Sequence, residues 1–128
     1  MAYRSLDGAA ITIATTETTL FEFEPGYGSR AMIQFANSGA TAFNSFKVYA
    51  RAGKANTTWA TLFSVSGDYT APAGVLVAAG SDPTVLAGAA NSWLIMDVSG
   101  FEAIRLTATV GSGTTTATGY VSLTSSGR

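Results

Sequence analysis

Apolar and polar residues alternate along most of the chain, which is the period-two pattern of strands that bury one face. In residues 46–51 the apolar side chains occupy one parity, while Lys47, Tyr49 and Arg51 occupy the other. Strands of this kind are predicted over residues 10–15, 20–24, 31–35, 46–51, 58–66, 92–96, 104–110 and 116–123. About eight strands and no helix of useful length predict an all-β protein, an antiparallel two-sheet β-sandwich that is jelly-roll-like.

Two of these segments carry more specific expectations. In residues 58–66 the alternation places four side chains on one face: Trp59, Thr61, Phe63 and Val65. Residues 93–96 read Trp-Leu-Ile-Met and are apolar at both parities. This second pattern predicts a strand that is central in its sheet or covered on both sides.

The clearest reversal of the chain lies near its C-terminal end. The strands predicted over residues 104–110 and 116–123 each keep their apolar side chains on one parity. Gly111-Ser112-Gly113 separates them, and glycine permits the backbone conformations of a tight reversal. Together these features predict a β-hairpin.

The segment from residue 67 to 91 breaks the alternation. It is rich in Ala, Gly and Pro and contains only short apolar pieces, at residues 75–77 and 85–86. We expect an extended connection with one or two short edge strands. Two interpretations stay open, since such a connection is either a crossover of the sandwich or a binding loop. Residues 1–8 are a possible N-terminal arm, and residues 1–128 as a whole fit one domain.

The composition is unusually poor in charge. Charged residues make up 12% of the chain and the formal net charge is −1, whereas roughly a quarter of an average soluble domain is charged. The surface must therefore consist largely of small neutral residues. Because weak charge gives little mutual repulsion, we expect the protein to associate with copies of itself or with a partner.

The chain contains no cysteine and no histidine. The first absence excludes disulfides and thiolate metal sites, and the second removes the usual general base and a common metal ligand. The aspartates in predicted turns, Asp68, Asp82 and Asp97, are far apart and do not form a calcium loop. We therefore predict no catalytic residue, no metal site and no cofactor.

One pair of carboxylates keeps a small hydrolase open as an alternative. Glu22 and Glu24 share a strand face, and their spacing of two strand rises, about 7 Å, is near that of a glycosidase pair. The favoured interpretation is a solvated face opposite two core phenylalanines. Neither Lys47 nor Lys54 lies in a Ser-x-x-Lys arrangement that would activate a serine. We expect no enzymatic activity.

Lys47, Tyr49 and Arg51 form a small basic and aromatic strip, with Lys54 just beyond. The strip is either a solvated face or a docking site for an acidic protein surface. The negative overall charge balance argues against nucleic acid as the partner.

Residues 1–8 lack the apolar region of a signal peptide, and the apolar runs are too short to span a bilayer. We expect a protein made in a cytoplasm, with no membrane partner.

A resemblance to a known class of protein rests on several segments in succession. They are residues 47–51 (KVYAR), 59–62 (WATL), 67–72 (GDYTAP), 97–106 (DVSGFEAIRL) and the following Gly-Ser-Gly and Thr-rich strand. Over residues 45–124 the chain resembles small β-rich virion structural proteins of tailed bacteriophages, which include head decoration (cement) proteins and tail accessory proteins. The resemblance implies a β-sandwich that assembles on a capsid lattice, often as a trimer, and it carries over no catalytic residue.

The function expected from the sequence is capsid decoration, in which the protein stabilises a phage head by bridging capsomers. The expected partners are the major capsid protein or another virion protein, and copies of the chain itself, and the expected location is the capsid surface of the virion. Partner-binding residues are expected in both segments 1–6 and 67–91 and on the basic strip: Tyr3, Arg4, Lys47, Tyr49, Arg51 and Tyr69.

The alternative to capsid decoration is a receptor- or carbohydrate-binding module on a phage tail or fibre. In that case exposed aromatic side chains would stack on sugar rings. The candidates are Tyr27, Tyr69 and Tyr120.

Overall fold

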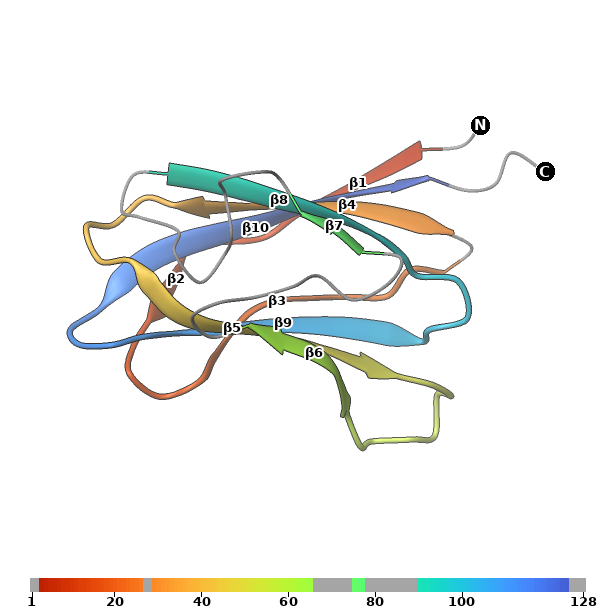
Figure 1. Cartoon of the computed structure of the whole chain (residues 1–128). Helices are drawn as coiled ribbons and strands as arrows, with labels where there is room; N and C mark the ends of the chain where they lie inside the picture. Colours follow the sequence, from red (N-terminus) through yellow and green to blue (C-terminus); the bar gives the residue numbers. More distant parts are fainter. Residues whose placement is uncertain (1–2, 27–28, 66–74, 78–89, 125–128) are drawn as a thin grey trace.

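The computed structural model describes residues 3–26, 29–65, 75–77 and 90–124 (Figure 1). Within these ranges the chain forms strands and no helix. The strands are β1 (Tyr3–Asp7), β2 (Ile11–Ile13), β3 (Thr18–Phe23), β4 (Arg30–Asn37), β5 (Phe43–Arg51), β6 (Ala60–Val65), β7 (Val75–Val77), β8 (Ala90–Asp97), β9 (Ala103–Val110) and β10 (Thr115–Thr124). No helix in the described ranges could therefore cross a membrane.

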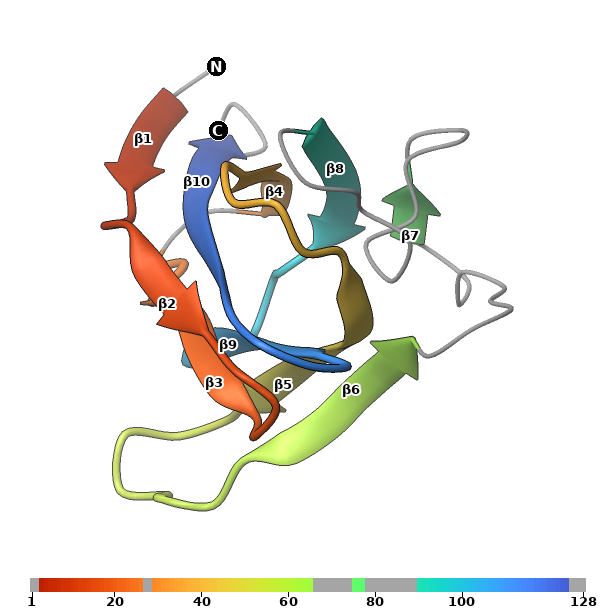
Figure 2. The same ribbon diagram turned by 90° about the vertical axis from the view of Figure 1, so that its left-hand side faces the viewer.

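The strands form two antiparallel sheets that face each other (Figure 2). Sheet A has the order β1-β10-β4-β8-β7, with β2 also paired to β10, and sheet B has the order β3-β9-β5-β6. The predicted all-β, two-sheet sandwich is therefore confirmed.

The pairing follows the plan of a jelly roll. Strands pair from the ends of the chain towards its middle: β2 with β10, β3 with β9, β4 with β8, and β5 with β6. This is one long antiparallel ribbon rolled into two sheets. The described residues form ten strands rather than about eight, since most of the predicted N-terminal arm forms β1 and β7 adds a short edge strand. β7 lies in the predicted long connection, most of which is outside the described residues.

The hydrophobic core lies between the sheets. Its largest fully buried side chains are Phe35, Phe43, Phe46, Ile13, Ile33, Leu94, Met96, Ile104, Leu106, Val48 and Val98. Phe35 of β4 and Phe46 of β5 meet edge to face with ring centroids 4.7 Å apart, so this contact joins sheet A to sheet B. In β5 the buried and half-buried positions alternate as the sequence pattern predicts.

The predicted hairpin between residues 104–110 and 116–123 is wrong. β9 belongs to sheet B, where it pairs with β3 and β5, whereas β10 belongs to sheet A. Alternation shows that each strand has a buried face, but it does not show which strand is its neighbour. Here the two strands turn their buried faces towards each other across the core. Gly113, with φ of 69°, lies in the connection that carries the chain from one sheet to the other.

The predicted common face of Trp59, Thr61, Phe63 and Val65 is also wrong. The register between β5 and β6 shifts, so that Thr61 lies opposite Tyr49 and Phe63 lies opposite Val48. Since neighbouring residues of β5 face opposite sides of the sheet, the strict alternation predicted for residues 58–66 does not hold across this irregularity. A single extra residue in a strand is invisible to a strict period of two.

Most of the expected N-terminal arm is a strand of the sandwich. Residues Tyr3 to Asp7 form β1 and pair with Thr124 to Tyr120 of β10. Backbone pairing along this whole segment makes it the edge of sheet A rather than a free arm.

Sheet A places β8 between β4 and β7, which confirms the central position expected for residues 93–96.

Candidate functional site

The outer face of sheet B carries a polar network centred on Glu17, which directly precedes β3. The Thr107 hydroxyl donates a hydrogen bond to Glu17 Oε2 at 2.6 Å, and the Tyr49 hydroxyl donates to the same oxygen. Thr107 is only 3% exposed although it lies on the outer side of β9. Its burial shows how closely the longer side chains of this face cover the sheet.

These hydrogen bonds shift the ionisation of both acidic groups. The bond from Thr107, followed by that from Tyr49, lowers the pKa of Glu17 below its ordinary value because both stabilise the carboxylate. Partial burial raises the pKa of Tyr49, and its donation to Glu17 adds to that rise. The network therefore favours the ionised form of Glu17 and the protonated form of Tyr49.

A second cluster on the same face is built around Trp59. The Arg105 guanidinium lies 4.3 Å from the centroid of the Trp59 ring, and that of Arg51 lies 5.1 Å from it. Arg105 also forms an ion pair with Glu22, with its Nε 3.1 Å from Oε2. Arg51 donates to the backbone oxygen of Asn56 at 2.8 Å. Charge on the outer face of sheet B is thus largely matched within the chain.

The predicted basic strip lies on this face, as the alternation in β5 implied. Tyr49 and Arg51 are bound within the chain by the contacts described above. Lys47 is half-buried and makes no hydrogen bond or ion pair within the described part of the chain. Of the three residues, Lys47 is therefore the one whose polar group is most available to a partner.

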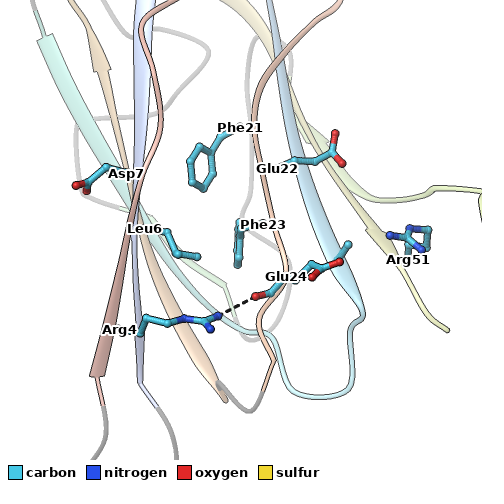
Figure 3. A pocket seen from close by; sticks show the side chains of 9 residues that line it. Arg4, Leu6, Asp7, Phe21, Glu22, Phe23, Glu24 and Arg51 are labelled. Atoms are coloured by element: carbon cyan, nitrogen blue, oxygen red, sulfur yellow. Dashed lines mark hydrogen bonds between the residues drawn. The ribbon is translucent and has the colours of Figure 1, made fainter. Parts of the chain in front are cut away.

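A groove opens along one edge of the sandwich, where β1 of sheet A separates from β3 of sheet B (Figure 3). Its volume is about 490 Å³, and Leu6, Phe21 and Phe23 supply its apolar lining. At one end Phe21 packs so closely on Gly8 that a Cβ atom there would lie 2.6 Å from the ring. Near the opening, Arg4 donates to the backbone oxygen of Glu24 at 2.9 Å. The predicted partner residue Arg4 is thus bound across the groove.

The groove does not assemble a reactive centre from the residues that line it. Glu22 and Glu24 both border it, but Glu22 is paired with Arg105. No group of three or more acidic side chains in the described ranges is arranged to hold a metal ion. The arrangement is an open groove with an apolar floor from Leu6, Phe21 and Phe23 and charged side chains of both signs around it.

The outer face of sheet A differs from both of these sites. We use this name for the side of the sheet formed by Met32, Gln34, Trp93, Ile95, Thr118, Tyr120 and Ser122. None of these side chains is charged. Tyr120 is 41% exposed, and the others are half-buried. The charged residues lie at the margins of the face: Asp7 on the edge strand, and Arg30 beside Asp97 at one end.

The Asp97 end of this face is held by a local turn. The backbone N–H of Ser99 donates to Asp97 Oδ1 at 2.9 Å. This bond, the Ser99 hydroxyl and the charge of Arg30 lower the pKa of Asp97. The charged end of the face therefore has its own satisfied interactions, outside the uncharged centre.

Sequence reasoning did not single out the outer face of sheet A. Its members come from β4, β8 and β10, which are far apart along the chain and meet only through the jelly-roll pairing. A usable signal was present, since Trp93 and Ile95 are apolar at the parity opposite to the buried Leu94 and Met96. Of the other predicted partner residues, Tyr3 begins β1 and Tyr69 lies outside the described residues.

Comparison with known proteins gives no family assignment. No protein-family model matches the chain, and no curated protein matches it. Among solved structures, the SPBc2 prophage-derived protein YomS superposes with a TM-score of 0.48 at 15% identity, covering 95% of this chain and 96% of that chain. A protein of Bacillus endospore appendages, described as disulfide-linked pili, gives a TM-score of 0.45 at 11% identity, covering 98% and 88% respectively.

Proposed function

We propose that this protein is a non-enzymatic structural protein of a phage virion, and specifically a capsid decoration protein that stabilises the head by bridging capsomers. The observation that carries the proposal is the uncharged outer face of sheet A. Its exposed and half-buried residues include Tyr120, Trp93 and Met32, which are types enriched in protein interfaces, and its centre lacks the charged residues that interfaces avoid.

The rest of the molecule supports a passive role in assembly. The face lies on a rigid support, since the two sheets are joined through a continuous apolar core. A surface that is ordered before binding loses little conformational freedom when it is covered. The resemblance of residues 45–124 to phage virion proteins indicates the phage virion as the assembly in which such a role is expected.

A decoration protein acts through mass action. When it binds the closed shell and not the dissociated subunits, the binding free energy adds to the stability of the shell. The direct test uses capsids from which this chain has been deleted, mixed with the purified protein. The proposal predicts that the protein sediments with the capsids and raises the temperature at which they open. No binding to these capsids would overturn it.

Tyr120 also supports a second candidate function, that of a receptor- or carbohydrate-binding module. It is 41% exposed on a flat face, an arrangement in which a phenol ring can stack on a sugar. A receptor- or carbohydrate-binding module on a tail or fibre would use this ring directly. Glycan binding by the isolated protein, lost in Tyr120→Ala and accompanied by no affinity for capsids, would favour this alternative over decoration.

A further inference from the structure

The outer face of sheet A is organised as cross-strand rows. One row contains Ser5, Ser122, Met32 and Ile95, and the next contains Asp7, Tyr120, Gln34 and Trp93. Residues that are opposite each other in antiparallel strands point to the same side of the sheet. The apolar side chains Met32, Ile95 and Trp93 therefore lie next to one another around Gln34, with Tyr120 on its other side.

We propose that this face packs against the same face of a second copy of the chain, which makes the protein a symmetric dimer. The inference rests on the proposed function, because it names the surface through which the assembly protein self-associates. It also differs from the trimer implied by the sequence resemblance, since contact between identical faces relates two copies by a twofold axis.

Charge selects the partner face. An uncharged surface is best covered by another uncharged surface, because any charge brought against it would lose its water without gaining a partner. The outer face of sheet B does not meet this condition. Docking there would desolvate Glu17 and the Arg105–Glu22 ion pair, which is partly exposed to water in the single chain. A head-to-tail contact of that kind would also remain open to endless addition.

The size of the face is sufficient for a stable pair. The strands β1, β10, β4 and β8, at about 4.8 Å spacing and about 3.3 Å rise per residue, give a flat area of roughly 500 Å² per copy. Two copies would bury roughly 1,000 Å², which is near the lower limit for a specific interface. We therefore expect a dimer that forms at micromolar rather than picomolar concentration.

Pairing through sheet A leaves both sheet B faces on the outside of the dimer. Each of them carries Lys47, the residue of the basic strip that is least engaged within the chain. The dimer would then present two equivalent contact surfaces on opposite sides. That geometry suits a protein that bridges two neighbouring subunits of a shell.

The mass of the protein in solution tests the proposal with a matched pair of variants. Tyr120 at 41% and Leu62 at 39% are the two exposed large hydrophobic residues of the described chain, one in each sheet. At tens of micromolar, light scattering should give a dimer for the wild type and for Leu62→Lys. Tyr120→Lys should raise the dissociation constant at least about a hundredfold, because each copy would bring an unpaired charge into an uncharged interface.

Cross-linking gives a second measurement that does not depend on weakening the dimer. Because the chain has no cysteine, a single introduced thiol is unique. Gln34→Cys lies in the middle of the face, whereas Thr61→Cys lies on β6 of sheet B. A bismaleimide that spans about 10 Å, the distance between packed sheets, should couple two copies of Gln34→Cys and leave Thr61→Cys uncoupled.

Three outcomes would overturn the inference. They are a monomeric wild type at these concentrations, an oligomer whose mass is unchanged in Tyr120→Lys, and efficient coupling of Thr61→Cys without coupling of Gln34→Cys. Circular dichroism establishes that each variant is folded. If the protein binds capsids but fails these tests, the proposed decoration function is retained and the proposed dimer is rejected. If it forms the dimer but ignores capsids, the proposed function fails alone.

Discussion

The two outer faces of the sandwich cover the same core but differ in their charge and in how that charge is paired. The outer face of sheet B carries charge, and most of its charged groups find a partner within the chain, as Glu17 does with Thr107 and Arg105 does with Glu22. The outer face of sheet A carries no charge at its centre and leaves Trp93 and Tyr120 partly in water. On the first face most charged groups are paired within a single chain, whereas the second face is completed by self-association.

This difference shows why charge and exposure must be considered together. The exposed aromatic and basic residues of sheet B look like an interface in the sequence, but Tyr49 and Arg51 are already bound by neighbours. Binding a partner there would require exchanging those contacts for new ones. Burying the outer face of sheet A would remove apolar surface from water without breaking an internal ion pair.

The largest effect on stability is expected from substitutions in the core that lies beneath both faces. Phe35→Ala and Phe46→Ala should each lower the free energy of unfolding by about 3–5 kcal/mol, because each removes half of the aromatic contact that joins the sheets. Chemical denaturation measures the loss. Leu62→Ala, at an exposed position, is the control and should change stability by no more than about 0.5 kcal/mol.

The same experiment can separate the two faces. Trp59 reports on sheet B and Trp93 on sheet A, and they are the only two tryptophans of the chain. If the sandwich unfolds as one unit, single-tryptophan variants will show the same midpoint. Midpoints that differ between the two reporters would mean that the faces do not share one cooperative core.

A smaller effect is expected from the charged cluster of sheet B. Arg105→Ala removes the ion pair with Glu22 and the stacking on Trp59, and it should cost about 1 kcal/mol of stability because the groups are partly exposed. Arg105→Lys keeps the charge but loses the planar stacking, so it should fall between alanine and wild type. Neither variant should alter the mass in solution. A change from dimer to monomer in Arg105→Ala would place association on sheet B instead.

The smallest effect concerns the pH dependence of the Glu17 network. The pKa of Glu17 is lowered in the folded protein by the bonds from Thr107 and Tyr49. Its contribution is therefore present above the ordinary pKa of 4.5, and it is lost as the pH falls through the lowered value. The difference in melting temperature between wild type and Glu17→Gln should be constant near neutrality and should shrink in acid.

Glu17→Gln is a suitable partner for this comparison because its amide oxygen can still accept both hydrogen bonds. Asp97, the other acid of the described residues with a lowered pKa, is present in both proteins, and its titration cancels in the difference. A difference that stays constant from about pH 7 to about pH 3 would show that the carboxylate charge of Glu17 does not contribute.

The fold class was predictable because each strand keeps one buried parity over several residues. The all-β sandwich and the buried set in β5 follow directly from that alternation. The pairing was not predictable locally. β9 and β10 are consecutive and each has one apolar parity, yet they lie in different sheets, because the jelly roll sets partners by position along the whole ribbon.

The candidate site was predictable only in part, for a similar reason. The strip of Lys47, Tyr49 and Arg51 lies within one strand, so the alternation alone places it on one face. The outer face of sheet A combines residue 32 with residues 93, 95 and 120, and only the register of β4, β8 and β10 brings them together. The position of Trp59 depended on a register shift in β6, which a strict alternation cannot represent.

The central claim is that the outer face of sheet A is covered by self-association while that of sheet B stays outside the dimer. Its most direct test is tryptophan fluorescence against protein concentration, with Trp93 alone present in Trp59→Phe and Trp59 alone present in Trp93→Phe. Light scattering on the same samples gives the mass. As each variant dimerises, Trp93 emission should move to shorter wavelength and become less accessible to acrylamide, while Trp59 should stay unchanged. A change at Trp59 with none at Trp93 would contradict the account.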